Sequence, residues 1–502
     1  MRRLASATSS EDFVKTLGRW RRLWRRRAGP AGGISARRHA KSLARKHIKR
    51  FKRLHNVSQL PRLQTGLSAD RLWMEAGAED VKLVFPPEAP PANDIADASR
   101  DARRRLKRAL RGGIAIGDKV HVDLVNSGNA AYRRLPSLAD RTVGESRTVR
   151  GLYLQAVGAA IVPYLSPDDV TRLTASGATV IDNQIIGATK PVAVSEPAGT
   201  ASAFWHLAKI GAHAAHARNL RGAGVTIGIL DTGINADHPE FAGKSIDFRA
   251  FAENGSPLPA IRARDYETHG THVAAICAGA TAGVAPEADL AVAAVLTARQ
   301  ETGEMCGFLM QIMAGIDWLA LEAGRRGDGV DLINASLGGA DGDEKYYETV
   351  LGHRVAGKLM VAAIGNLGEN GIDNHNIPGR FDCVLAVGAS DINDDVAYFS
   401  AWGRTYAGSM PTPNFKPDLV APGVRIKSAI ASGAYAPLSG TSMACPMVSG
   451  AAALLIQQDS SLRDNPDALI TKILSLTSSL PKGRHTSDPR RYGYGRLDLA
   501  GL

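Results

Sequence analysis

The sequence predicts an α/β protein built around a mainly parallel β-sheet with helices on both faces. Five apolar runs are nearly continuous rather than alternating, which is typical of strands buried on both faces. Helical stretches lie between these runs, and a strand–helix–strand order makes neighbouring strands parallel and places helices over the sheet. The predicted strands are 225–230, 290–295, 330–336, 359–364 and 384–389, and the predicted helices between them are 269–278, 308–323 and 345–356.

Length and charge divide the chain into parts. Its 502 residues are enough for two or three domains. The net charge of +12 is uneven, because the first 54 residues hold 18 of the 61 Lys and Arg residues but only two acids. We expect a basic amphipathic arm (1–54), a linker and helical region (55–117), a small α/β domain (118–195) and the main α/β domain (203–502).

The basic arm carries one apolar helical face. Phe13, Leu17, Trp20 and Trp24 recur at spacings of four, three and four, and Arg and Lys fill the other faces. Such a segment binds nucleic acid through phosphates, lies on an anionic membrane, docks on an acidic protein, or is simply a solvated arm. The sequence leaves these alternatives open.

Residues 55–195 contain a linker and a short α/β pattern. Prolines at 86–91 predict a stiff linker. A strand is expected at 120–125, and Ser166-Pro167 predicts a helix start because proline suits the first turn. A return strand is expected at 177–181.

Cysteine usage and hydropathy bear on the compartment. The four cysteines form no CxxC pair and therefore indicate neither a zinc site nor a disulfide framework. No apolar run approaches the ~18–20 residues of a membrane span, and no basic cluster precedes the apolar stretch of a secretory signal. We expect a cytoplasmic location, with secretion as the alternative.

Gly440-Thr-Ser-Met-Ala-Cys-Pro446 places a serine before a long apolar helix. Proline is tolerated only near a helix start, so the helix begins close to Ser442. There the backbone N–H of Ser442 has no partner within the helix and lies at the positive end of the helix dipole. That position suits a nucleophile that forms an oxyanion, although helix-capping serines are also common.

Two further motifs supply partners for this serine. Gly228-Ile-Leu-Asp-Thr-Gly-Ile234 ends a strand with an acid, and His269-Gly-Thr-His-Val-Ala274 begins a small-residue helix with a histidine. The three motifs, in this order, resemble those of the subtilisin-like serine peptidases (subtilases), over about residues 203–475. The resemblance implies a serine endopeptidase that uses Asp231, His269 and Ser442 through an acyl-enzyme, with His272 as a structural residue. The alternative is a catalytically silent peptide-binding scaffold.

The resemblance also assigns residues around the reacting bond. Asn366, after a predicted strand, matches the asparagine that donates to the oxyanion. Protein or peptide substrates would bind in extended form against the segment 336–338, and small residues would wall the pocket. The implied substrate-binding residues are Ser336, Leu337, Gly338, Ala362 and Ala363.

Residues 118–195 resemble the inhibitory propeptide of the same family by pattern and position, with an unrelated accessory domain as the alternative. The propeptide interpretation implies self-cleavage roughly between Ile186 and Ala203. The family requires no cofactor for catalysis, and many members bind calcium for stability. Asp237 and Asp247 could contribute, but no dedicated calcium loop and hence no metal site is recognisable. Cys445 is expected to pack as a small apolar residue, with thiol sensitivity as the alternative.

Overall fold

The computed structural model describes residues 78–86, 104–105, 108–109, 119–126, 146–163, 165–187, 191–193, 204–258, 261–300, 305–339, 347–407, 410–478 and 488–502. The predicted arm at 1–54 and its nucleic-acid, membrane and acidic-protein partners therefore lie outside the described residues. Among the residues described, no helix is both long enough and apolar enough to cross a membrane.

A nine-stranded sheet forms the centre of the main domain, in the order β20-β21-β17-β14-β13-β12-β7-β9-β8. Every neighbouring pair is parallel except the terminal pair β20–β21. The prediction of a mainly parallel sheet is confirmed. The strands are β7 (Thr226–Asp231), β8 (Ile246–Ala250), β9 (Asp289–Ala294), β12 (Leu332–Ala335), β13 (Leu359–Ala363), β14 (Leu385–Ser390), β17 (Leu419–Pro422), β20 (Thr477–Ser478) and β21 (Arg496–Leu497).

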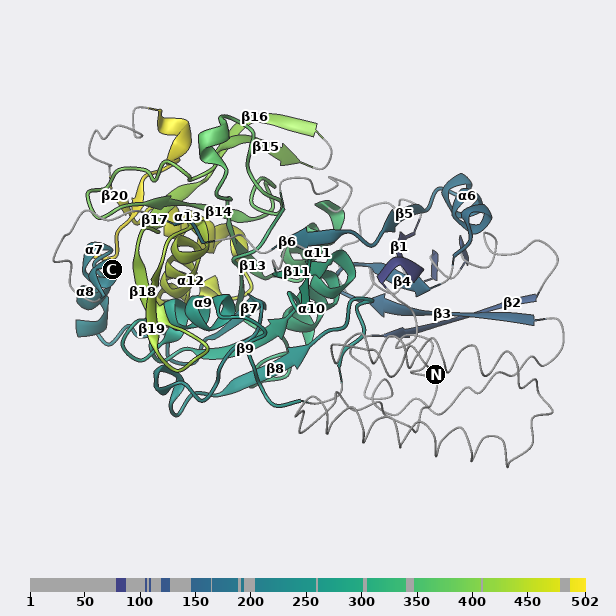
Figure 1. Cartoon of the computed structure of the whole chain (residues 1–502), viewed down its shortest axis with the longest axis horizontal. Helices are drawn as coiled ribbons and strands as arrows, with labels where there is room; N and C mark the ends of the chain where they lie inside the picture. Colours follow the sequence, from purple (N-terminus) through teal and green to yellow (C-terminus); the bar gives the residue numbers. More distant parts are fainter. Residues whose placement is uncertain are drawn as a thin grey trace, which may run out of the picture. The chain divides into compact units, whose positions relative to one another are not determined.

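Helices cover this sheet on both faces (Figure 1). The core on one face includes residues of α9 (His269–Ala278), α12 (Thr441–Gln458) and α13 (Pro466–Leu474). The core on the other face includes residues of α10 (Leu309–Leu321) and α11 (Tyr347–Val355). Strand side chains alternate between the two cores, which explains why these strands are apolar throughout.

A second sheet is formed by residues before the main domain, in the order β2-β3-β4-β1-β5. Its elements are β1 (Val81–Phe85), β2 (Lys119–Asn126), β3 (Ser146–Leu154), β4 (Ala159–Pro163), α6 (Pro167–Ala175) and β5 (Thr179–Asp182). The helix begins as predicted, because Ser166 accepts a hydrogen bond from the Asp169 N–H and Asp169 bonds back to Ser166. Strand β1 lies where the sequence predicted a linker, since the short apolar run 81–85 directly precedes the prolines.

The other α-helices and β-strands lie outside these two sheets, and two of these helices directly precede β7 in sequence. They are β6 (Ile185–Gly187), α7 (Trp205–Lys209), α8 (Ala212–Ala217), β10 (Ala298–Arg299), β11 (Met305–Phe308), β15 (Gly403–Ala407), β16 (Met410–Lys416), β18 (Ile426–Ala429) and β19 (Tyr435–Leu438). Strand β6 follows the second sheet in sequence but pairs with β11, whose chain continues directly into α10.

Candidate active site

Asp231 and His269 form a buried hydrogen-bonded pair. Asp231 is the last residue of β7, and His269 is the first residue of α9. His269 Nδ1 lies 2.8 and 3.0 Å from the two carboxylate oxygens of Asp231. An ionised carboxylate can only accept, so Nδ1 carries the proton and Nε2 presents its lone pair. His269 Nε2 is buried and has no hydrogen-bond partner among the described residues.

The surroundings of His269 shift its pKa in opposing directions. Burial lowers its pKa, but the charge and hydrogen bond of Asp231, with weaker contributions from Glu267 and Asp265, raise the pKa above its ordinary value of 6.5. His272, one helical turn on, differs. Burial lowers its pKa to about 3, and its Nε2 lies 3.0 Å from the Ala436 carbonyl oxygen. His272 is therefore a neutral, fixed group.

Ser442 is the second residue of α12, as the position of Pro446 predicts. Pro446 has no N–H, so the carbonyl of Ser442, four residues earlier, lacks its usual partner within the helix. The hydroxyl of Ser336, at the end of β12, donates to this carbonyl at 3.0 Å. The Ser442 Oγ in turn donates to the Ser336 carbonyl oxygen at 3.2 Å. These two bonds attach the helix start to the sheet.

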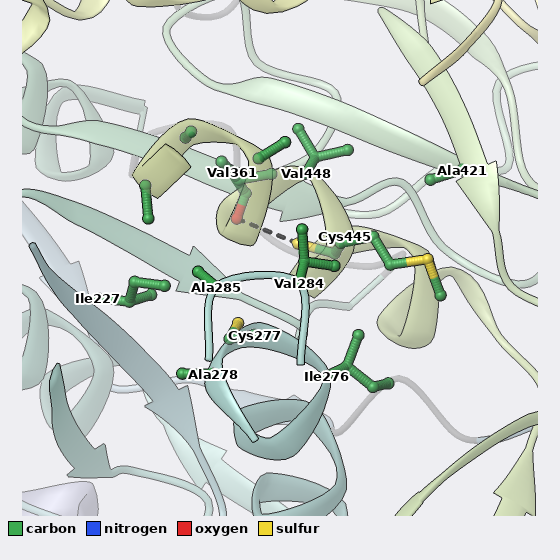
Figure 2. Packing of buried hydrophobic residues seen from close by; sticks show 14 of the residues in the cluster. Ile227, Ile276, Cys277, Ala278, Val284, Ala285, Val361, Ala421, Cys445 and Val448 are labelled. Carbon is green, nitrogen blue, oxygen red and sulfur yellow. Dashed lines mark hydrogen bonds between the residues drawn. The ribbon is translucent and has the colours of Figure 1, made fainter. Parts of the chain in front are cut away.

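Polar groups beneath the helix strengthen this attachment. The side chain of Asn334, on β12, donates to Ser336 Oγ at 3.0 Å and accepts from Ser449 Oγ at 2.8 Å. The Cys445 thiol contacts Asn334 Oδ1 at 3.2 Å. It also contacts the Val361 carbonyl oxygen at 3.3 Å, as Figure 2 shows. Burial raises the pKa of Cys445, so this thiol stays protonated and packs in the core.

Asn366 follows β13 at the carboxyl edge of the same sheet, where functional groups of parallel α/β folds gather. Its side-chain oxygen accepts from the N–H and the hydroxyl of Thr441, both at 2.9 Å. Thr441 directly precedes Ser442. The two bonds therefore hold the Asn366 amide group beside the helix start that carries the serine.

The segment that precedes the main domain forms backbone contacts with β11, Gly338 and Ser439 of the main domain. Strand β6 pairs antiparallel with β11, and the Gly338 N–H contacts the Gly187 carbonyl oxygen at 3.4 Å. Five residues later, the Val192 N–H donates to the carbonyl oxygen of Ser439, which lies three residues before Ser442, at 2.7 Å. The sequence predicted a binding role for Gly338 but not for β11 or Ser439, because contacts made by backbone groups do not depend on residue type.

The other predicted substrate residues are buried. Leu337 is 1% exposed, and Ser336, Ala362 and Ala363 are 0% exposed. Ala362 and Ala363 belong to the cores on opposite faces of β13. Their role as pocket walls stays a prediction.

The two acids considered for calcium have other partners. Asp237 accepts two hydrogen bonds of 2.7 Å from Arg262, and Asp247 accepts from the Gly324 N–H at 3.1 Å. No group of three His, Cys, Asp or Glu side chains in the described part of the chain is arranged to hold a metal ion. Neither acid therefore belongs to a cluster of such side chains in the described part of the chain.

Comparison with known proteins identifies the family of this chain. The model of the subtilase family matches residues 222–495, which is more than half of the chain. An alkaline protease of Alkalihalobacillus alcalophilus is 36% identical over 375 residues, covering 74% of this chain and 86% of that protein.

Two further relatives come from other bacteria. Subtilisin-like protease PopC of Myxococcus xanthus is 33% identical over 354 residues, covering 63% of this chain and 71% of the relative. An intracellular serine protease of Paenibacillus polymyxa is 36% identical over 244 residues, covering 47% of this chain and 68% of the relative. Because the family model matches more than half of the chain and the relatives are covered over most of their length, the chain belongs to the subtilase family and is a serine endopeptidase.

Proposed function

We propose that Ser442 is the nucleophile of this peptidase, His269 its general base and Asp231 the group that orients the base. The observation that carries the proposal is the buried His269–Asp231 contact, in which Nδ1 is bonded to the carboxylate while Nε2 has no hydrogen-bond partner among the described residues. The Ser442 hydroxyl, which bonds to the Ser336 carbonyl in the resting arrangement, turns toward Nε2 when a substrate binds. Catalytic hydrogen bonds often form fully only in the substrate complex.

The reaction then proceeds in two halves. Ser442 Oγ attacks the carbonyl carbon of a protein or peptide substrate while His269 Nε2 takes the hydroxyl proton. The imidazolium, stabilised by Asp231, returns this proton to the leaving amine as the C–N bond breaks, which leaves an acyl-serine. Water, activated by the same imidazole, attacks the ester and releases the new carboxyl end and the free serine.

The negative charge on the substrate oxygen is stabilised by the Ser442 backbone N–H and by the side chain of Asn366. Replacing Asn366 with alanine should lower kcat by about 10²–10³-fold with little change in KM, because the donor acts mainly on the developing charge. That range was measured in subtilisin, a member of the same family. Steady-state kinetics on a peptide anilide tests it. The matched control is Asn374→Ala, in the same loop, whose side chain donates only to nearby backbone carbonyls. Equal kcat values for the two variants would contradict the role of Asn366.

The segment before the main domain acts as an inhibitory propeptide in this proposal. Its strand β6 adds to β11 as an extended substrate would, and Gly187 and Val192 contact residues on either side of Ser442. Several hydrogen bonds join it to helix α10, among them one from the Leu309 N–H to the Gln184 carbonyl oxygen at 2.8 Å. The Ala156 N–H donates to the buried Asp317 carboxylate at 2.7 Å, and the Met310 N–H donates to Asn183 Oδ1 at 3.0 Å.

This arrangement narrows the expected site of self-cleavage. The chain should be cut at a bond between Gly187 and Val192, since only this stretch lies between the two contacts that flank Ser442. Intact-mass and N-terminal analysis of the purified wild-type protein should find a new N-terminus in this window. The Ser442→Ala chain should stay uncut. A wild-type N-terminus outside this window would contradict this assignment.

The four cysteines support a reducing compartment as the site of action. All four are free and buried in the structure. Oxidising compartments favour disulfides, whereas reducing ones preserve thiols.

A further inference from the structure

Asp265 lies four residues before His269 and accepts four hydrogen bonds. Its Oδ1 accepts from Thr232 Oγ1 at 2.7 Å and from the Glu267 N–H at 3.0 Å. Its Oδ2 accepts from Thr271 Oγ1 at 2.5 Å and from the Thr271 N–H at 2.8 Å. One carboxylate therefore satisfies donors from three segments of the chain.

Two of these segments carry the proposed catalytic pair. Thr232 directly follows Asp231, and its Oγ1 also accepts from the N–H of Gly270, the residue after His269, at 2.9 Å. Thr271 lies two residues after His269, and its Oγ1 accepts from the Asn235 N–H at 2.9 Å. The side chain of Asp265 thus connects the end of β7 with the first turn of α9 through two threonines.

The backbones of these segments are in close contact. A Cβ atom on Gly270 would stand 2.1 Å from the Gly233 carbonyl oxygen. Gly233 has a φ of +120°, which favours glycine, and a Cβ atom added to it would stand 2.1 Å from the Arg264 carbonyl oxygen. Asp265 forms an isolated β-bridge with Gly233, so its carboxylate is anchored beside the segment that it fixes.

We infer that Asp265 is a positioning residue, whose carboxylate fixes the distance and angle between Asp231 and His269. The inference rests on the proposed roles of Asp231, His269 and Ser442. An aspartate is needed because all four contacts are donors, and an amide in its place would turn N–H groups toward at least one threonine. Loss of these bonds lets the first turn of α9 shift, and small misplacements of a catalytic group have large effects on rate.

The same carboxylate also acts on the base electrostatically. The charged or titratable groups that act on His269 are Asp231 on β7, Asp265 and Glu267 in the loop before α9, and His272 on α9. Asp265 raises the pKa of His269, so removing its charge lowers that pKa. The general base must be neutral to accept a proton. The acid limb of the pH profile therefore moves to lower pH in a variant without this charge.

The test is the variant Asp265→Asn in the self-processed enzyme, with active sites counted by a fluorophosphonate. We expect kcat to fall about 10- to 100-fold, the loss associated with hydrogen bonds to a charged group, while KM changes little. The acid limb of kcat/KM should move to lower pH. The matched control is Asp418→Asn. Asp418 is another partly buried carboxylate, which directly precedes β17 and so lies at the amino ends of the strands; it accepts hydrogen bonds from the Ala386 N–H and from Lys416. This variant should keep both the kcat and the pH profile of the wild type.

A second pair of variants separates positioning from general stability. Thr232→Val removes the hydroxyl that donates to Asp265 and should lower kcat. Thr232→Ser keeps a hydroxyl there and should have the kcat of the wild type. The double variant Asp265→Asn/Thr232→Val should lose less than the product of the two single losses, because the residues share one interaction. Multiplying losses, or an Asp265→Asn enzyme indistinguishable from Asp418→Asn, would overturn the inference. The catalytic assignment itself is tested separately by Ser442→Ala, and activity retained in that variant would contradict it.

Discussion

The variant Ser442→Ala should lose about 10⁶-fold in kcat and all labelling by a fluorophosphonate. This magnitude was measured for the nucleophile of subtilisin itself. The physical reason is that the neighbouring hydroxyl at the start of α12, that of Thr441, is already held by Asn366 Oδ1 at 2.9 Å and by the Gly365 N–H at 3.2 Å, so it does not replace Ser442 Oγ. Activity should be measured with a peptide anilide, and labelling by gel or mass spectrometry.

Ser449→Ala provides the matched control on the same helix. Ser449 is as fully buried as Ser442, and its hydroxyl donates to Asn334 Oδ1 at 2.8 Å. Its loss should lower the melting temperature but leave kcat per labelled site unchanged. Retained activity in Ser442→Ala, or equal losses in both variants, would contradict the assignment of the nucleophile.

The variant Asp231→Asn should lose about 10⁴-fold in kcat, a factor known for serine peptidases with the same triad. Asparagine can still accept from the Thr232 N–H, which Asp231 does at 2.7 Å, so the local fold is preserved. Its amide then presents an N–H group to His269 Nδ1. The proton consequently moves to Nε2, where the imidazole can no longer take the serine proton. Steady-state kinetics on enzyme with titrated active sites measures this loss.

The control for this variant is Asp331, which directly precedes β12 and contacts the first residue of β7. Asp331 is 2% exposed, and it accepts from the N–H of Thr226, the first residue of β7, at 2.7 Å. Asp331→Asn should destabilise the protein without changing kcat per active site. A loss of kcat in Asp331→Asn as large as that in Asp231→Asn would assign the effect to the strand and not to the chemistry.

The sequence allowed prediction of the parts of the fold that are apolar throughout. Strands β7, β9, β12, β13 and β14 were predicted because parallel strands buried on both faces require unbroken apolar runs. The edge strand β8 was not predicted, since Ile246–Ala250 mixes charged and apolar residues. The two-residue strands β20 and β21 are too short for any periodicity to be detected.

In the candidate site, the sequence predicted which residues take part but not which contacts they form with one another. The identities of Asp231, His269 and Ser442 could be proposed from three local motifs. The bonds of Asp265 to Thr232 and Thr271 could not, because they depend on how a strand end, a loop and a helix meet. Backbone contacts such as that between Val192 and Ser439 are independent of residue type and leave no trace in the sequence.

The proline in α12 places a constraint on redesign of this enzyme. Because Pro446 frees the carbonyl of Ser442 for the hydroxyl of Ser336, the short segment that contacts β6 also supports the proposed nucleophile. In the proposed assignment, one stretch of chain therefore serves both substrate binding and reactivity. Exchanging residues 334–338 for those of a peptidase with another preference would therefore disturb the geometry of the nucleophile, whereas the edge provided by β11 can be altered independently.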